Sequence, residues 1–362
     1  MRILVEALCA EYGGIRTYVD NLLPAWMAVA PDDEVHVMVQ SDSTIVVPAP
    51  LVRHDIAVRG PQSVARPLAQ TRHTSRLVRE LRPDVVLATL PSTTVRRLDV
   101  PLGVVVYDLR HELRPEQFER SRRLLRWASY GRGYATADGF VSISHRTLSD
   151  LHALHPATAD KPAVVAHLGG DHVDHWPHTG PSDRVVTFAH HTNKNLDLVL
   201  DGWQHLGPTA PELLVLGVSG DRRTTLDEEV ARRGLAGVVT LAPFLDEGDF
   251  RRTLAGAALV LFPSDFEGFG LPVVEGMRLG VPVVIGPEPA TREVAGGHAF
   301  EMSTWQPDEL ARAVRAGLAA TPAQLASARE HAAGFTWANT VTQTRALLTT
   351  LLEPAPPAGR PG

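Results

Sequence analysis

The sequence predicts an α/β protein built from two Rossmann-like domains in tandem, each with a parallel sheet. Short β-branched apolar runs alternate with helical apolar patterns along the chain, which is typical of parallel sheets covered on both faces. The alternation stops once, in the Gly-, Pro-, His- and Asp-rich stretch 168–183, and then resumes. The length of 362 residues agrees with two domains, because single domains seldom exceed about 200 residues.

The first half of the chain carries five expected strands and four expected helices. Apolar, β-branched runs predict strands at 2–8, 34–39, 84–88, 102–106 and 139–143. Helical spacing of apolar residues predicts helices at 17–29, 71–81, 120–134 and 146–154. We therefore expect an N-terminal domain over 1–170, followed by a linker over 171–183.

The second half repeats the pattern. Strands are expected at 185–188, 212–216, 238–241, 258–262 and 281–285, with helices near 196–206, 226–233 and 249–255. The stretch 321–351 reads as two helical pieces, of which 336–352 is expected to pack back toward the N-terminal domain. The second domain is thus predicted over 184–335, and the Pro- and Gly-rich tail 353–362 is expected to be disordered.

Composition excludes several classes of protein. The net charge of −6 and pI of about 6.2 argue against a nucleic-acid binder, which usually carries a basic excess. The single cysteine, Cys9, excludes an internal disulfide framework and suits a reducing compartment. No apolar run is long enough for a membrane span, and the N-terminal apolar run reaches Glu6 and Glu11 too soon for a signal peptide. We expect a soluble, cytoplasmic protein.

The most informative segment is LFPSDFEGFGLPVVEGMRLGVPVVI, at 261–285. A strand ends there, a loop with Glu267, Gly268, Phe269 and Gly270 follows, and Pro272 suits the first turn of a helix. Glycines let the backbone approach a ligand closely, and a helix N-terminus attracts anions. Glu275 is expected in the first turn of that helix, where a carboxylate favours the helix dipole. The segment predicts a phosphate cradle with two carboxylates, although a purely structural turn has the same spacing.

This segment resembles the E-x7-E signature of the family 4 retaining glycosyltransferases, which have the GT-B fold: two Rossmann-like domains facing a central cleft. The resemblance extends over nearly the whole chain, in order. It includes GGIRTYVDNLLPAW at 13–26, VVVYDLRHELRPEQF at 104–118, FVSISHRTLSDL at 140–151, NKNLDLVLDGWQHL at 193–206 and FTWANTVTQTRALL at 335–348.

The resemblance implies roles for individual residues. Glu267 would lie against the donor sugar, Glu275 would hold the nucleotide ribose, and Lys194 would pair with the diphosphate. The loop Gly268, Phe269, Gly270 and Leu271 would present backbone N–H groups to the donor, while Gly13 and Gly14 would approach the diphosphate from the first domain. Only Lys161 and Lys194 are lysines in this chain, which favours a specific role for Lys194, although an exposed surface lysine is the alternative.

The chain departs from the family at two places. Tyr107 precedes Asp108 where relatives often have His-Asp; Asp108 is expected near the reacting sugar, with Tyr107, Arg110 and His111 on the acceptor side. His190 and His191 stand where many relatives carry a basic partner to the lysine, and His190 is expected at the donor phosphates. The Arg-rich helix at 120–134 is expected to be a solvated face rather than a peripheral membrane contact.

The resemblance implies a metal-independent retaining hexosyltransferase that needs no cofactor besides its nucleotide-sugar substrate. The donor would provide a hexose or deoxyhexose, and the acceptor would be a hydroxyl of a natural product, a glycan or a lipid-linked intermediate. The His- and Asp-rich stretch 168–183 lacks a recognised metal-ligand spacing, so no metal site is expected there. A nucleotide-sugar epimerase or hydrolase of the same fold, or a non-catalytic relative that acts as a partner protein, remain the alternatives.

Overall fold

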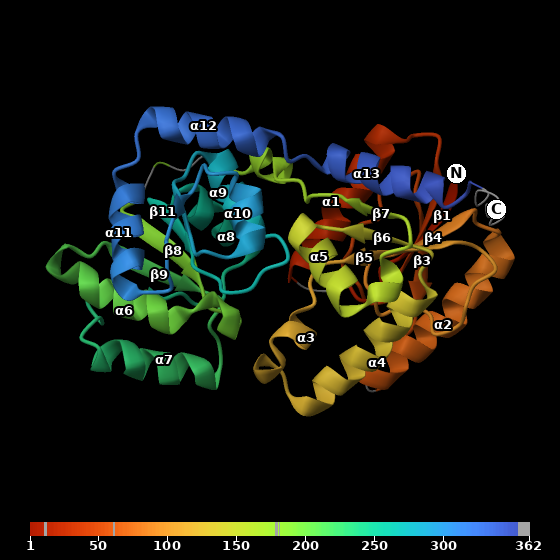
Figure 1. The fold of residues 1–362 in the computed structure, drawn as a ribbon, viewed down its shortest axis with the longest axis horizontal. Coiled ribbons are helices and arrows are strands. Elements are labelled where there is room, and N and C mark those ends of the chain that lie inside the picture. The colour runs from red at the N-terminus through yellow and green to blue at the C-terminus, as the bar shows by residue number, and fades with distance from the viewer. Residues whose placement is uncertain (11–12, 61, 178–179, 181, 354–362) are drawn as a thin grey trace, which may run out of the picture. The chain divides into compact units, whose positions relative to one another are not determined.

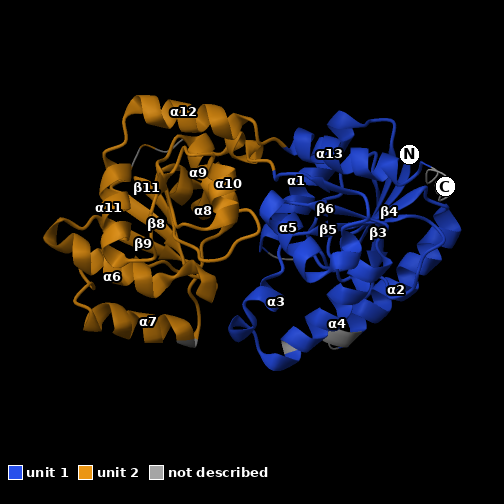
Figure 2. Ribbon diagram, in the orientation of Figure 1, with its two compact units in different colours: residues 1–168, 337–362 blue, residues 169–336 orange. Residues whose placement is uncertain are grey.

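The chain forms two compact α/β units. A computed structural model describes residues 1–10, 13–60, 62–177, 180 and 182–353. Unit 1 comprises Met1–Leu168 and Trp337–Gly362, and unit 2 comprises Gly169–Thr336 (Figure 2). Each unit contains one parallel sheet with helices packed on it (Figure 1). The predicted class, two Rossmann-like α/β domains in tandem, is confirmed.

The sheet of unit 1 has the strand order β3-β2-β1-β4-β5-β6-β7, with all neighbours parallel. The chain moves outward from β1 to β3 and then returns to β4 on the other side of β1, which makes the sheet doubly wound. The strands are β1 (Arg2–Glu6), β2 (Glu34–Gln40), β3 (Val52–Ile56), β4 (Val85–Ala88), β5 (Leu102–Val106), β6 (Gly139–Ser142) and β7 (Ala163–Val165).

The central strands of unit 1 are apolar and buried on both faces, as parallel sheets require. Its helices are α1 (Gly13–Val29), α2 (Gln62–Leu81), α3 (Arg110–Leu113), α4 (Arg120–Thr136), α5 (His145–Leu154) and α13 (Trp337–Thr350). Helix α13 packs on the sheet where two glycines make room for it. A Cβ atom at Gly103 would lie 2.9 Å from Leu348, and one at Gly139 would lie 3.1 Å from Leu347.

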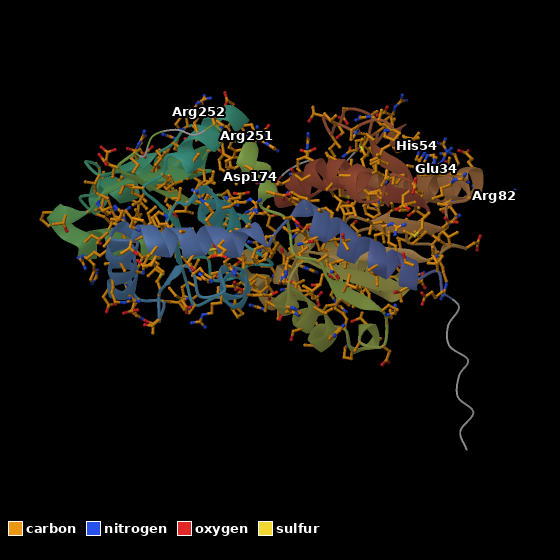
Figure 3. All side chains as sticks on the ribbon, turned by 90° about the horizontal axis from the view of Figure 1, so that it is seen from above. Glu34, His54, Arg82, Asp174, Arg251 and Arg252 are labelled. Atoms are coloured by element: carbon orange, nitrogen blue, oxygen red, sulfur yellow. The ribbon has the colours of Figure 1, made fainter. Side chains whose placement is uncertain are left out.

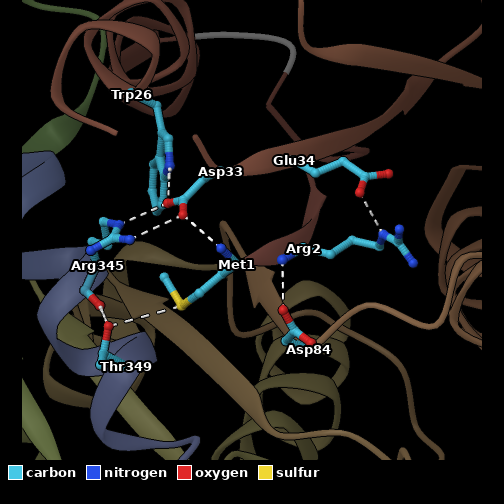
Figure 4. Close-up of polar contacts among 8 residues, drawn as sticks. All are labelled: Met1, Arg2, Trp26, Asp33, Glu34, Asp84, Arg345 and Thr349. Carbon is cyan, nitrogen blue, oxygen red and sulfur yellow. Dashed lines mark hydrogen bonds and ion pairs between the residues drawn. The ribbon is translucent and has the colours of Figure 1, made fainter. Parts of the chain in front are cut away.

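A buried carboxylate also holds α13 in unit 1 (Figure 4). Asp33 accepts hydrogen bonds from the Met1 ammonium at 2.8 Å, from the Trp26 indole at 3.1 Å, and from Arg345 of α13 at 2.8 and 3.1 Å. Burial alone would raise the pKa of Asp33, but the hydrogen bonds from Arg345, the ammonium and Trp26 outweigh it and lower the pKa. The C-terminal helix is therefore joined to the first strand and first helix of the chain.

The sheet of unit 2 repeats the same winding with the order β10-β9-β8-β11-β12-β13, again parallel. Its strands are β8 (Arg184–Phe188), β9 (Glu212–Leu216), β10 (Val239–Leu241), β11 (Leu259–Phe262), β12 (Val283–Ile285) and β13 (Phe300–Glu301). Its helices are α6 (Leu196–Leu206), α7 (Asp221–Arg232), α8 (Glu247–Ala255), α9 (Leu271–Leu279), α10 (Pro289–Ala295), α11 (Pro307–Leu318) and α12 (Pro322–Ala333). Trp203 of α6 is fully buried in its core.

Most expected elements occur within a few residues of their predicted bounds, and 102–106, 196–206 and 212–216 match fully. Helix α2 is longer than expected and contains Pro67. The sequence analysis missed β3, β7, β13, α3, α10 and α11. Strand β3 lies at a sheet edge and is mostly polar, so it lacks the apolar signal of the inner strands.

The unit boundary falls between Leu168 and Gly169, at the start of the expected linker region. Residues Asp171–His175, within the expected linker, form a short 3-10 helix, η3, that belongs to unit 2. The expected disordered tail lies outside the described residues beyond Glu353. Among the described helices, none has the length and apolar character of a membrane span.

Candidate active site

The strand order of unit 2 reverses between β8 and β11. Helix α6 follows β8 toward β9 on one side, whereas α9 follows β11 toward β12 on the other. Ligands of doubly wound sheets bind at the carboxyl ends of the strands beside such a reversal. Two loops meet there: the β8–α6 loop over 189–195, which contains the 3-10 turn η4 (Thr192–Lys194), and the β11–α9 loop over 263–270.

These two loops are joined by hydrogen bonds. The Asp265 backbone N–H donates to the Asn193 carbonyl at 3.0 Å, and the Asn193 amide donates to the Phe266 carbonyl at 2.8 Å. The Asn195 amide donates to the Pro263 carbonyl at 3.0 Å. Asn195 has a φ of 50°, in the left-handed region that asparagine tolerates better than most residues. The loops thus form one platform whose side chains are positioned by both strands.

Lys194 and Glu267 are in direct contact on this platform. The Lys194 ammonium lies 2.5 Å from Glu267 Oε1, and the Asn193 amide donates to the same oxygen at 3.0 Å. The side chains are only 7% and 15% exposed, and the ammonium lies 4.2 Å from the centre of the Phe262 ring. Lys194 is therefore not an exposed surface lysine. A buried cation and a carboxylate held by neighbours can offer charge and hydrogen bonds to a polar ligand without reorganising.

The loop after Glu267 leads directly into α9. Gly270 is the N-cap residue, with a φ of 98° that favours glycine, and Pro272 lies in the first turn as expected. The first N–H groups of a helix lack partners in the preceding turn, which suits this end to an anion. In α9, Pro272 has no N–H and the Val273 N–H donates to the Gly270 carbonyl at 2.8 Å, so only the other N–H groups of this end could meet a ligand. The Phe269 ring is buried and packs edge-on against Phe335, with the centroids 5.9 Å apart. Phe269 could therefore serve a ligand through its backbone only, whereas Leu271 is half-buried.

Glu275 lies on α9, but not in its first turn as the sequence analysis expected. The helix begins at Leu271, directly after the left-handed Gly270, so Glu275 is its fifth residue. The Glu275 side chain is 7% exposed, and its Oε1 lies 3.1 Å from Nε2 of His172 in η3. Its partner is thus a side chain of the region expected to be a linker, which spacing along the sequence could not indicate.

His190 lies at the end of β8 and is exposed. Its ring centroid is 4.8 Å from that of His191. Gly217, which follows the neighbouring strand β9, allows this close approach: a Cβ atom there would lie 2.9 Å from the His190 Cβ. His190 is therefore accessible from solvent, and its contact with a donor phosphate stays a prediction.

The remaining predicted residues belong to unit 1. Gly13 and Gly14 are exposed and open helix α1 after β1, and Gly13 has a φ of 64°. Asp108 follows β5 and accepts a hydrogen bond from the Arg110 backbone N–H at 2.9 Å. The Arg110 guanidinium lies 5.2 Å from the centre of the Phe118 ring. Gly13 and Gly14 thus follow the carboxyl end of β1, and Asp108 and Arg110 follow that of β5.

The Tyr107 hydroxyl and the His111 side chain are buried in unit 1, whereas Tyr107 as a whole and Asp108 are half-buried. The Tyr107 ring packs edge-on against Tyr18 at 5.6 Å, and burial raises the pKa of its hydroxyl well above the usual range. His111 is 1% exposed, packs edge-on against Tyr130 at 5.0 Å, and lies 3.4 Å from a carboxylate oxygen of Glu112. Burial lowers the pKa of His111, which favours its neutral form. Trp127 lies on α4, which contains the Arg-rich segment expected to be a solvated face, and its side chain is 60% exposed.

Three site residues had no role in the sequence analysis. Asn193 binds Glu267, His172 binds Glu275, and the Ser264 hydroxyl is fully buried at the end of β11, without a hydrogen-bond partner among the described residues. The proximity of Asn193 to Lys194 in sequence was a signal that could have been used. His172 and Ser264 are identified only by their positions in the fold.

Comparisons with known proteins identify the family and the fold that the chain resembles. A family model described as Glycosyltransferase Family 4 matches residues 12–168, and one described as Glycosyl transferases group 1 matches residues 182–320. A D-inositol 3-phosphate glycosyltransferase of Mycolicibacterium gilvum is 31% identical over 222 residues, 57% of this chain and 48% of that protein. The O-antigen chain mannosyltransferase B of Escherichia coli is 30% identical over 139 residues, 36% of this chain and 35% of that protein. The chain thus spans about half or less of these curated relatives.

Two solved structures resemble the chain over 97% of its length. Sucrose-phosphate synthase from Thermosynechococcus elongatus is 14% identical with a TM-score of 0.75, and 99% of that chain is covered. Anabaena HepE in complex with UDP-glucose is 17% identical with a TM-score of 0.71, and 99% of that chain is covered. At these identities the likeness concerns the fold.

Proposed function

The chain belongs to the family 4 glycosyltransferases and has their GT-B fold, and from that premise we propose a retaining hexosyl transfer from a nucleotide sugar to a hydroxyl acceptor. The sugar would be a hexose or deoxyhexose, and the acceptor a natural product, a glycan or a lipid-linked intermediate. The observation that carries the proposal is the contact between Lys194 and Glu267 at the strand-order reversal of unit 2.

The chemistry of that contact suits a departing diphosphate. When the bond between the anomeric carbon and the phosphate oxygen breaks, negative charge grows on the leaving group. Lys194, buried and already oriented by Glu267, would stabilise that charge, and the N-terminus of α9 would add its N–H groups. As the family resemblance implies, the proposed reaction uses no metal ion and no cofactor besides the nucleotide sugar. The new glycosidic bond would form on the same face of the sugar, and the acceptor proton would pass to the leaving phosphate oxygen.

The donor would occupy unit 2. The Glu267 carboxylate has a second oxygen that can accept hydrogen bonds from sugar hydroxyls. Glu275 would hold the ribose hydroxyls, and exposed His190 would contact a phosphate. A UDP-glucose complex of the structurally similar HepE supports a nucleotide-sugar donor. The acceptor would bind unit 1 near Asp108, and the roles of Gly13, Gly14, Tyr107, Arg110 and His111 stay predictions.

The test removes each member of the pair separately. With the donor that gives turnover in a panel of UDP-, GDP-, ADP- and dTDP-sugars, Lys194→Ala and Glu267→Gln should each lower kcat by about 10²- to 10³-fold. Turnover near the wild-type value in both variants would contradict the proposal. The anomeric configuration of the product, read by proton NMR, tests retention, and addition of EDTA tests the metal-independent reaction.

Lys161→Ala is the matched control, because Lys161 is the other lysine in the chain. Its ammonium donates to the carbonyls of Tyr134, Ala135 and Ala137 at 3.0, 3.1 and 2.7 Å, near the end of α4 in unit 1. The control should lower the melting temperature and leave kcat of the folded protein close to wild type. Donor consumption without any acceptor would instead indicate an epimerase or hydrolase. Failure of every donor to bind would indicate a non-catalytic protein.

A further inference from the structure

Helix α9 is held against η3 by two polar pairs. Glu275 Oε1 lies 3.1 Å from His172 Nε2, and Arg278, three residues further along α9, donates to both carboxylate oxygens of Asp174 at 2.7 Å (Figure 3 labels Asp174). Gly170, just before η3, approaches α9 so closely that a Cβ atom there would lie 3.0 Å from Val274. The two-oxygen pairing of Arg278 with Asp174 is sufficient to fix the spacing between helix and turn.

The contact between His172 and Glu275 is more buried than the ion pair between Arg278 and Asp174, which is called the outer pair below. Asp174 is 48% exposed, whereas the His172 and Glu275 side chains are only 12% and 7% exposed. The His172 ring packs edge-on against Trp176 at 5.7 Å, and Trp176 packs edge-on against Phe250 at 6.0 Å. The Trp176 ring therefore packs against the His172 imidazole, whose Nε2 points at the Glu275 carboxylate.

We propose that His172 is a positioning residue for the nucleotide: it donates its Nε2–H to Glu275 Oε1 and so directs the other oxygen, Oε2, toward the ribose hydroxyls. The inference rests on the proposed function, in which Glu275 binds the ribose. A glutamate side chain has three rotatable bonds, and ordering it at the moment of binding costs conformational entropy. A partner that orders it beforehand raises the affinity for the nucleotide.

A purely structural role for His172 would have a different signature. If His172 only supported α9, its loss would weaken binding of every nucleotide alike, because the whole loop after β11 would shift. If His172 orients Glu275, its loss should weaken binding only of ligands whose ribose hydroxyls can donate hydrogen bonds to the Glu275 carboxylate. The hydroxyls of the ligand and the imidazole of the protein should then be energetically coupled.

The experiment is a double-mutant cycle between protein and ligand. Calorimetry measures the affinity of whichever of UDP, GDP, ADP and dTDP binds the wild type most tightly, and of its 2′,3′-dideoxy analogue. His172→Phe keeps the ring and its packing against Trp176 but removes the donor. We expect it to weaken binding of the parent nucleotide about tenfold and to leave binding of the dideoxy analogue unchanged.

Two further variants separate the outcomes. His172→Gln places an amide donor near the position of Nε2 and should restore most of the affinity, whereas Asp174→Asn weakens the outer pair and should leave the difference between the two nucleotides unchanged. Equal losses for both nucleotides in His172→Phe, or no loss for either, would overturn the positioning role. If no nucleoside diphosphate binds the wild type, the proposed function fails, and this inference with it. Melting temperatures without ligand verify that each variant is folded.

Discussion

The two sheets have the same strand order around their first strand, which reverses between β1 and β4 in unit 1 and between β8 and β11 in unit 2. The glutamates beside these two reversals nevertheless have different hydrogen-bond donors: neutral groups alone in unit 1, and a cation with a neutral group in unit 2. In unit 1, Glu6 ends β1 and accepts hydrogen bonds from three neutral groups: the Gln70 amide at 2.9 Å, the Thr93 hydroxyl at 2.5 Å and the Thr74 hydroxyl. In unit 2, Glu267 accepts from the Lys194 ammonium and the Asn193 amide. Glu6 is 2% exposed, whereas the Glu267 side chain is 15% exposed.

This difference shows how one topology provides both a structural centre and a candidate reaction centre. In unit 1, side chains of α2 and of the loop after β4 occupy the positions around the carboxyl group that a ligand would otherwise take. Burial raises the pKa of Glu6 and outweighs the hydrogen bonds from Thr74, Thr93 and Gln70, which lower it. In unit 2, the carboxylate has a cation beside it and remains partly accessible, so the fold leaves its polar groups available for chemistry.

The largest effect on stability is expected at Glu6. Glu6→Ala would leave the donors of Gln70, Thr74 and Thr93 buried without an acceptor, at about 1 to 3 kcal/mol each. We expect unfolding free energy to fall by about 3 kcal/mol or more, measured by denaturant titration. Glu6→Gln, which keeps an acceptor oxygen, should cost less. Equal midpoints for Glu6→Ala and the wild type would contradict the structural role.

The raised pKa of Glu6 also predicts the pH dependence of stability. Above 4.5, the ordinary pKa of a glutamate side chain, the folded state keeps its proton on Glu6 more readily than the unfolded chain does. The unfolding free energy contributed by this group therefore decreases as the pH rises from about 4.5 through the raised pKa. Glu6→Gln should remove this decrease, whereas a variant with an unchanged slope would show that Glu6 does not titrate in this range.

A smaller effect is expected at Asp33, which joins α13 to β1 and α1 in unit 1. Asp33→Asn weakens hydrogen bonds from Arg345 and the Met1 ammonium, and we expect a loss of about 2 kcal/mol in unfolding free energy. Because the pKa of Asp33 is lowered, its stabilisation is complete above 3.8, the ordinary pKa of an aspartate side chain, and is lost as the pH falls through the lower pKa of the folded state. The Asn variant should lack this acid-side loss in thermal melts. If Asp33→Asn shows the same acid-side loss of stability as the wild type, Asp33 does not stabilise the contact between α13 and the N-terminal part of the chain.

The smallest effect is expected at Ser264 in unit 2. Its hydroxyl is fully buried without a hydrogen-bond partner among the described residues, so Ser264→Ala removes no hydrogen bond that the fold uses. The melting temperature should stay unchanged or rise slightly, in contrast to Glu6→Ala. If Ser264→Ala loses as much stability as Glu6→Ala, the polar groups at the reversal of unit 2 stabilise the fold as those of unit 1 do, and the proposed difference between the two units is wrong.

Elements with strong local patterns could be predicted from the sequence, and elements defined by their neighbours could not. The inner strands and α6 carry continuous apolar or helical spacing, which reports burial directly. Strand β3 (VRHDI) exists because β2 supplies hydrogen bonds at a sheet edge, and its own residues carry little apolar signal. Glu275 was assigned to the first turn of its helix because the start of α9 depends on the backbone conformation of Gly270.

The E-x7-E segment was sufficient to indicate the family and to predict roles for Glu267 and Glu275, and the separate segment at 193–206 predicted the role of Lys194. Each of these segments is short, so its pattern is visible in the sequence alone. Which side chains touch was decided by the folded chain. Lys194 and Glu267 are separated by 73 residues, and His172 and Glu275 by 103. Parallel strands bring such distant loops to one edge of a sheet, and a linear pattern contains no information about those distances.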